Sequence, residues 1–278
     1  MSEKREGQQR EGRQALVNAI VAGLMGATML VLVGCSSTKD DPNSQATLDK
    51  LYKEAKDDMD SGSYDRAIKS FEKLEGRAAG TVLAQQAMLD SAWANYKSGE
   101  KAAALTVLDR FVKLNPSSAA MDYALYLRGI INFNDDLGLF GRLAGQNVTE
   151  RDQQASRDAL LAFRELVERF PDSKYADDAA LRADYINNAL ASYETHVARY
   201  YYNRGAYMAA ANRAQRAISD YPHAPSGEEA LHLMALAYAK LDLPQLKTDA
   251  ERVLKLNYPN SAYVKGEQEA KKAWWKFW

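Results

Sequence analysis

Few residues in this 278-residue chain combine the types and spacing that catalysis or metal binding requires. The three histidines are scattered at His196, His223 and His232, and none belongs to a His-Glu-x-x-His metal motif. The sequence also lacks a Gly-x-Ser-x-Gly nucleophile turn and a glycine loop that would cradle phosphate. We therefore expect a protein that binds other molecules and catalyses nothing, without a metal or a cofactor.

Pairs of adjacent aspartates are the remaining candidates for acid–base or metal chemistry. They are Asp57-Asp58, Asp135-Asp136 and Asp177-Asp178. Neighbouring residues of a helix point about 100° apart, so two adjacent carboxylates do not face the same ligand. We expect these pairs to lie on solvated faces or at helix caps.

The single cysteine, Cys35, lies in a setting that indicates a covalent modification. It follows a charged N-terminal stretch and a run from Ala15 to Val33 that is apolar apart from Asn18 and Thr28. The run ends in Leu-Val-Gly-Cys, which resembles the lipobox of bacterial lipoprotein signal peptides. The resemblance implies that residues 1–34 are a signal peptide and that Cys35 becomes the mature N-terminus, carrying covalent lipid.

Three acyl chains on Cys35 would hold the protein on a membrane, because each buried methylene contributes roughly 0.8 kcal/mol. An uncleaved transmembrane anchor is the alternative, since the apolar run is about long enough to span a bilayer. Ser36 and Ser37 follow the cysteine, and the absence of an aspartate there favours the periplasmic face of the outer membrane by resemblance to enteric lipoproteins. Residues 35–44 are predicted to be a flexible tether that ends at Ser44, a candidate helix N-cap.

The composition is that of an ordinary globular protein, with 46% hydrophobic residues, 26% charged residues and a net charge of −1. Removal of the four basic and three acidic residues of the first 34 leaves 32 basic and 34 acidic residues, a formal charge of about −2. Nucleic-acid binding depends on a basic surface that displaces counterions. The charge balance therefore argues against a nucleic-acid partner.

A repeated pattern organises the chain beyond residue 45, which is predicted to be helical almost throughout. The copies share a small residue and an apolar residue four places later, and all but the first copy end in a proline. The small residue recurs at Ala67, Ala104, Ala159 and Ala210. In a degenerate fifth copy Leu246 stands in its place. The small residue lets two helices approach closely and the apolar one fills the space between them. The pattern resembles the tetratricopeptide repeat.

We therefore predict an all-α fold, a right-handed solenoid of about five tetratricopeptide helix pairs in one domain from residue 45 to 262. The repeats are expected near residues 45–80, 85–118, 121–172, 176–223 and 227–260. An irregular helical bundle is the alternative. Residues 134–152 are predicted to be an exposed loop inside the third repeat, and the absence of a helix breaker from Ala176 to Asn203 predicts a long helix, continuous or with one break.

Several segments resemble more specifically the BamD family, the tetratricopeptide lipoproteins of the outer-membrane β-barrel assembly machinery. These segments are Arg110–Pro116, Tyr123–Gly129, Phe170–Tyr175, Tyr200–Tyr207, Asn212-Arg213 and Asp220–Pro222. The resemblance covers residues 35–260. It fails after Leu74, where the usual Tyr-Pro is missing, and in the tail of residues 263–278.

The resemblance implies a non-catalytic scaffold that helps insert β-barrel proteins into the outer membrane. Its implied partners are the barrel subunit BamA, the accessory lipoproteins of the complex and unfolded outer-membrane proteins. Arg213, beside Asn212, is the candidate contact with the barrel subunit, because a guanidinium fork suits a carboxylate. Its alternative role is that of a solvated helix charge.

The early repeats are expected to form a groove for the substrate's C-terminal β-signal, with Tyr52, Trp93 and Tyr96 as candidate anchors. Ordinary packing between helices is the alternative for each of these rings. A periplasmic repeat lipoprotein that scaffolds cell-wall or division enzymes is the alternative function.

The C-terminal tail combines lysines with four large aromatic residues, Trp274, Trp275, Phe277 and Trp278. This mixture suits a lipid headgroup interface or a pocket on a partner. A final helix folded back onto the last repeat is the plain alternative, and docking of the tail into the chain's own groove is a third hypothesis.

Overall fold

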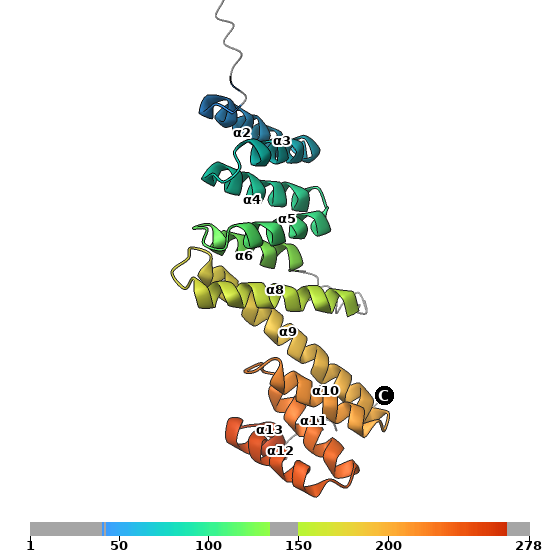
Figure 1. Cartoon of the computed structure of the whole chain (residues 1–278). Helices are drawn as coiled ribbons and strands as arrows, with labels where there is room; N and C mark the ends of the chain where they lie inside the picture. The colour runs from blue at the N-terminus through green and yellow to red at the C-terminus, as the bar shows by residue number, and fades with distance from the viewer. Residues whose placement is uncertain (1–40, 42, 134–149, 266–278) are drawn as a thin grey trace, which may run out of the picture. The chain divides into compact units, whose positions relative to one another are not determined.

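The computed structural model describes residue 41 and residues 43–133 and 150–265, and every regular element in these ranges is an α-helix (Figure 1). The helices are α2 (Gln45–Asp60), α3 (Tyr64–Arg77), α4 (Val82–Lys97), α5 (Lys101–Leu114), α6 (Met121–Asn132), α8 (Glu150–Arg169), α9 (Ala176–Asn203), α10 (Tyr207–Ser219), α11 (Gly227–Lys240), α12 (Pro244–Asn257) and α13 (Ala262–Lys265). The predicted all-α class is confirmed. None of the described helices combines the length and the apolar character that crossing a bilayer requires.

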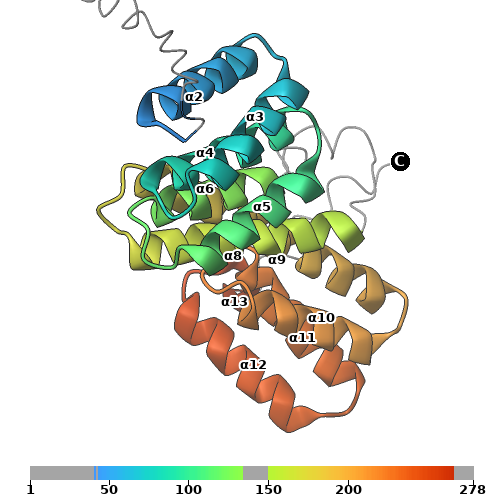
Figure 2. The same cartoon turned by 45° about the horizontal axis from the view of Figure 1, so that its top comes forward.

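Helices pack mainly against their neighbours in the chain. Contacts divide the chain into Met1–Asp49 and Lys50–Trp278, and the packing described here is that of the second unit. From α3 to α12 each described helix packs on the next one along the chain (Figures 1 and 2). The first helices of successive pairs also meet, since α4 contacts α6 and α9 contacts α11. This nearest-neighbour packing of helix pairs is that of a helical-repeat solenoid.

The repeated small residues lie where the pattern predicts close helix contact. Ala67, Ala104, Ala159 and Ala210 are fully buried, and each belongs to a buried stripe on the second helix of its pair. The residues four places later, Phe71, Leu108, Phe163 and Ala214, are buried as well. The spacing of four places these pairs on one helix face, which explains why the sequence pattern identifies the core.

Glycine turns join the two helices of three pairs. Gly62, Gly99 and Gly205 have φ angles of 77°, 93° and 78°, a left-handed conformation that glycine adopts without a Cβ clash. In the last pair Asp242 takes this position with a φ of 58°. Aspartate tolerates the left-handed region better than most residues, so the same turn forms without a glycine.

Two details of the repeat prediction are wrong. Leu246 does not occupy the buried position of the fifth repeat, since its side chain is 44% exposed and Ala250 and Leu254 provide the buried stripe of α12. The predicted loop extends too far, because α8 already begins at Glu150; residues 134–149 lie outside the described residues.

Two other predictions are confirmed. The long helix expected between Ala176 and Asn203, continuous or with one break, is α9, which runs unbroken over these 28 residues. Ser44 caps α2 as expected, since its Oγ accepts a hydrogen bond from the backbone N–H of Thr47 at 3.3 Å.

Candidate partner-docking site

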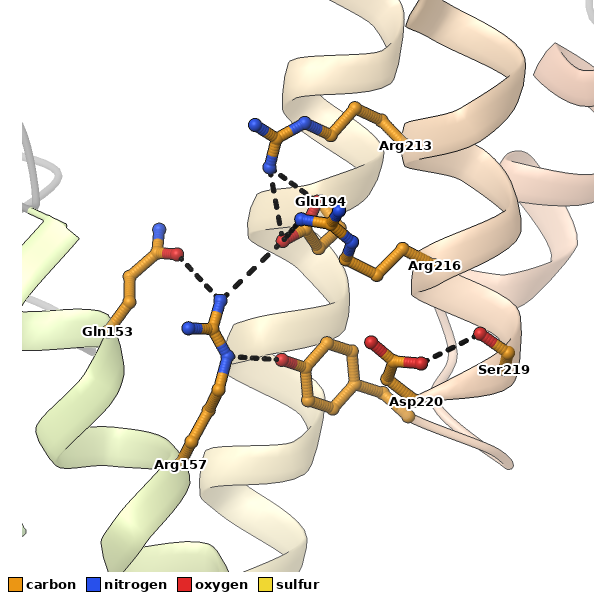
Figure 3. Close-up of polar contacts among 8 residues, drawn as sticks. Gln153, Arg157, Glu194, Arg213, Arg216, Ser219 and Asp220 are labelled. Atoms are coloured by element: carbon orange, nitrogen blue, oxygen red, sulfur yellow. Dashed lines mark hydrogen bonds and ion pairs between the residues drawn. The ribbon is translucent and has the colours of Figure 1, made fainter.

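A cluster of three arginines around one buried glutamate lies where α8, α9 and α10 meet (Figure 3). Glu194 belongs to α9, on the face that also buries Leu190, Ala191 and Ala198. The second helix, α10, approaches this face closely because it buries four alanines there: Ala210, Ala211, Ala214 and Ala217. The small side chains leave room for long ones beside them, and two arginines of α10 reach Glu194.

Arg213 makes the closest contact with Glu194. Its Nη1 donates to Oε2 of Glu194 at 3.0 Å and to Oε1 at 3.4 Å. Terminal nitrogens of Arg157, from α8, and Arg216, from α10, both lie 3.9 Å from Oε1. The Glu194 side chain is 1% exposed, whereas those of Arg213, Arg157 and Arg216 are 32%, 33% and 49% exposed. The carboxylate thus lies beneath three partly exposed cations.

Arg157 is held from two further sides. Its Nε donates to the hydroxyl of Tyr221 at 3.1 Å, and its Nη2 donates to Oε1 of Gln153, one helical turn earlier, at 3.2 Å. Gln153 is buried, and its Nε2 has no hydrogen-bond partner among the described residues. A buried amide donor without a partner is costly, so this position favours an acceptor supplied from outside the described chain.

The surroundings of Arg213 and Arg157 favour the charged form of both side chains. The hydrogen bond to Glu194 raises the pKa of the Arg213 guanidinium, although burial opposes this. The hydrogen bond with the Tyr221 hydroxyl, followed by the charges of Glu194 and Asp220, raises the pKa of Arg157, with burial again opposing. Both groups stay charged at any physiological pH, so the cluster suits binding of an anion and offers no acid–base chemistry.

The structure gives Arg213 a partner that the sequence reasoning missed. Arg213 is not simply a solvated charge, because it forms an ion pair with Glu194 inside the chain. Its neighbour Asn212 is exposed on α10. One sequence feature pointed to Glu194: it is a charged residue on the helix face that carries Leu190, Ala191 and Ala198, and a charge on an apolar face needs a counter-charge.

The predicted groove residues fall into two groups. Trp93 and Tyr96 lie on α4 with their ring centroids 5.5 Å apart, and both are partly buried against the main core cluster. Nζ of Lys97 lies 5.7 Å from the Trp93 ring. The two rings pack against the core and also keep partly exposed surfaces that a ligand can contact.

Tyr52 is engaged within the chain. Its hydroxyl donates to Oδ2 of Asp90 on α4 at 2.9 Å, and Lys56 lies 3.5 Å from the other oxygen of the same carboxylate. Burial, followed by the hydrogen bond to Asp90, raises the pKa of Tyr52. Asp90 lies one helical turn before Trp93, which brings Tyr52 to the same face of α4.

One aspartate of each described pair forms contacts within the fold. Asp58 pairs with Arg66 at 2.9 Å, and Asp178 accepts hydrogen bonds from Tyr126 at 2.7 Å and Arg182 at 2.6 Å. Within residues 43–133 and 150–265, no group of three or more His, Cys, Asp or Glu residues is arranged to hold a metal ion. Cys35, Asp135-Asp136 and the aromatic residues Trp274, Trp275, Phe277 and Trp278 lie outside the described residues.

Comparison with known proteins gives consistent matches. The family model described as "Outer membrane lipoprotein" (YfiO) matches residues 44–254. A protein of Neisseria meningitidis serogroup B named "Outer membrane protein assembly factor BamD" is 46% identical over 255 residues, which cover 90% of this chain and 96% of that protein. The protein of the same name from Xylella fastidiosa (strain Temecula1) is 32% identical, over 87% of this chain and 83% of that protein. The one from Haemophilus influenzae is 33% identical, over 83% of this chain and 88% of that protein.

Among solved structures, a crystal structure of MamA protein matches with a TM-score of 0.35 and 16% identity, covering 77% of this chain and 96% of that one. Similarity at this level carries no argument about function.

Proposed function

This chain belongs to the outer-membrane lipoprotein family of the assembly factor BamD, and on that premise we propose that it is a non-catalytic scaffold of the outer-membrane protein assembly complex. It would help insert β-barrel proteins into the outer membrane by holding the barrel subunit and the unfolded substrate. The single observation that carries the proposal is the arginine cluster around Glu194, a partly exposed cationic site on an otherwise slightly acidic chain. The alternative of a scaffold for cell-wall enzymes has no comparable support.

The arginine cluster is the proposed contact with the barrel subunit. Arg213 forms one end-on contact with Glu194 through Nη1, and its other nitrogens have no partner among the described residues. A guanidinium can engage a second carboxylate through these nitrogens, and such charge-assisted bonds are about twice as strong as neutral ones. A partner's acidic side chain would therefore complete the cluster, with Asn212 at its edge.

The face of α4 that carries Trp93, together with Tyr96 and Tyr52, is the proposed contact with the substrate's β-signal. Aromatic rings at a partly exposed site supply large apolar contact area at a small entropy cost, which is why they act as binding anchors. Tyr52 would act differently from Trp93, because its hydroxyl is already committed to Asp90.

Cys35 is the proposed site of lipid attachment and hence of anchoring to the periplasmic face of the outer membrane. Mass spectrometry of the purified protein tests this: we expect an N-terminal peptide that begins at Cys35 with three acyl chains. An unmodified Cys35, or an intact leader, would contradict the anchor. Accessory lipoproteins of the complex are further proposed partners.

Affinity purification of the intact lipoprotein in a mild detergent tests the function. We expect a large outer-membrane barrel with periplasmic domains to copurify, and to be lost from the Arg213→Glu variant. The matched control is Arg252→Glu on α12, where the arginine is 62% exposed and, among the described residues, pairs only with Asp249. Recovery of cell-wall enzymes without the barrel subunit would overturn the proposal.

A further inference from the structure

The buried carboxylate at the centre of the arginine cluster has a role that the docking proposal leaves out. We propose that Glu194 is the positioning residue of the docking site, which fixes Arg213 and organises Arg157 and Arg216 into one surface spanning two repeats. This inference rests on the proposed docking role of Arg213.

Glu194 is closed off from solvent and from direct contact with a partner. Its side chain is 1% exposed and is reached by Arg213 at 3.0 Å, so a partner cannot contact it without displacing an arginine. A buried carboxylate is a weak source of net stability, because its desolvation offsets much of the attraction to its partner. A position of this kind is consistent with a role in orienting Arg213.

The ion pair orders the Arg213 side chain before a partner binds. A free arginine side chain must lose rotamer freedom when it binds, which weakens binding. Arg213 has lost much of this freedom already, because both oxygens of Glu194 accept from its Nη1. Figure 3 shows its second terminal nitrogen pointing away from Glu194. The ion pair thus presents the remaining donors in advance of the partner.

Positive charge exceeds negative charge in the arginine cluster. Three guanidinium groups face Glu194, and even with Asp220, whose charge acts on Arg157, the cations outnumber the carboxylates. Glu194 alone therefore cannot neutralise the cluster. The buried Nε2 of Gln153 adds a donor without a partner among the described residues. The surplus of donors and positive charge fits a partner that supplies at least one further carboxylate.

The arginine cluster joins two successive repeats. Arg157 belongs to α8, the second helix of the third repeat, whereas Arg213 and Arg216 belong to α10, the second helix of the fourth. Glu194 lies on α9 between them and contacts all three (Figure 3). The docking surface therefore includes Arg157 and does not end at Arg213.

Positioning and plain electrostatics predict opposite effects of Glu194→Gln. If only net charge mattered, loss of a negative charge would strengthen the binding of an acidic partner. If Glu194 positions Arg213, the variant keeps its size but loses one charge-assisted bond, and the complex dissociates roughly tenfold faster. Association at low salt stays the same or becomes faster, because the site gains positive charge.

The test measures association and dissociation rates between the full lipoprotein in detergent and the purified barrel subunit. The variants are Glu194→Gln, Arg213→Gln, the double variant, Arg157→Gln and, as a control, Arg252→Gln. We expect Glu194→Gln and Arg157→Gln to speed dissociation and the control to have no effect. In the Arg213→Gln background Glu194→Gln should have a clearly smaller effect, because only its contacts with Arg157 and Arg216 remain. That lack of additivity is the signature of action through Arg213.

Three outcomes would overturn the inference: tighter binding of Glu194→Gln, unchanged dissociation, or an equal effect with and without Arg213. The last would mean general destabilisation, which thermal denaturation of the same variants would reveal independently. Weaker binding of Arg213→Gln with normal binding of Glu194→Gln would remove the positioning role and leave the proposed function intact. Absence of binding by the wild type would overturn both.

Discussion

Arg213 on α10 donates through one terminal nitrogen to both oxygens of Glu194 on α9, at 3.0 and 3.4 Å, across the contact between the two helices of one repeat. The same guanidinium is 32% exposed, so it faces solvent as well as the interior. One side chain thus holds a repeat together and is the proposed contact for a partner. Its variants must therefore be assessed for stability as well as for binding.

The stability prediction concerns Arg213→Ala, which removes the nearest counter-charge from a buried carboxylate. Arg157 and Arg216 remain about 4 Å away, so we expect a loss on the order of 2 kcal/mol, below the range for a fully orphaned buried charge. Urea denaturation measures this. Arg252→Ala, which breaks an exposed pair, should lower the free energy of unfolding by less than about 0.5 kcal/mol. Equal losses for the two variants would show that the burial of Glu194 does not strengthen its ion pair with Arg213.

A second prediction concerns the contact between Gly129 on α6 and Phe163 on α8. A Cβ at position 129 would lie 2.3 Å from Cε1 of Phe163, whose ring is fully buried. We expect Gly129→Ala to destabilise the fold by about 2 kcal/mol, because overpacking exceeds the gain in helix propensity. Gly76→Ala on α3 is the control, since nothing lies within 4 Å of its Cβ position.

The control should be neutral or stabilise the protein by up to about 1 kcal/mol. Thermal denaturation of both variants measures the difference. Phe163→Leu combined with Gly129→Ala should recover part of the loss, because it removes the clashing ring atoms. A Gly129→Ala protein as stable as the control would contradict the close approach of α6 and α8.

The repeat pattern made most of the helix pairing predictable. Ala67 and Ala104 are small because two helices meet there, and that requirement is visible in one sequence at a regular spacing. The last repeat was harder, since Leu246 matched the spacing although Ala250 and Leu254 make the contact. A degenerate repeat therefore predicts that a helix is present more reliably than it predicts which face of that helix is buried.

A third prediction concerns pH and Asp178. Its hydrogen bond with Arg182, together with that from Tyr126, lowers the pKa of this carboxyl below its ordinary value of 3.8. The ionised form therefore favours the folded state, and its contribution is present above that value and is lost as the pH falls through the lower, folded-state pKa. We expect Asp178→Asn to lower the melting temperature at neutral pH, by a small amount because the carboxylate is 46% exposed.

The difference between wild type and Asp178→Asn should shrink as the pH falls below 3.8 and through the lowered pKa of the folded wild-type carboxyl, because that carboxylate is then protonated as well. Melting curves across this range measure it. Asp172→Asn, in the exposed turn before α9, is the control. A difference that grows in acid would contradict the sign of the shift.

A fourth prediction concerns the groove. Trp93→Ala should weaken binding of a peptide with the C-terminal strand of an outer-membrane barrel by at least about tenfold, the effect of losing an aromatic anchor. Fluorescence anisotropy of a labelled peptide measures the affinity. Leu256→Ala on α12, where the leucine is 68% exposed, is the control for loss of surface apolar area; equal effects would remove Trp93 from the site.

The arginine cluster shows what a single sequence leaves out. Arg213 was found through a family resemblance, but Arg157 is 56 positions away on another helix and belongs to no motif. Only the packing of α8, α9 and α10 brings these side chains to one carboxylate. A charged residue on an apolar face, such as Glu194, is the kind of feature that indicates a hidden partner without identifying it.

The most direct test of the central claim is complementation in cells depleted of this protein. The measurement is the folded fraction of a resident outer-membrane barrel, determined from its heat-dependent gel mobility, at equal levels of membrane-anchored variant. We predict that wild type and Arg252→Glu restore folding and that Arg213→Glu does not. Full restoration by Arg213→Glu would contradict docking through the arginine cluster, and failure of the wild type to restore folding would contradict the assembly function itself.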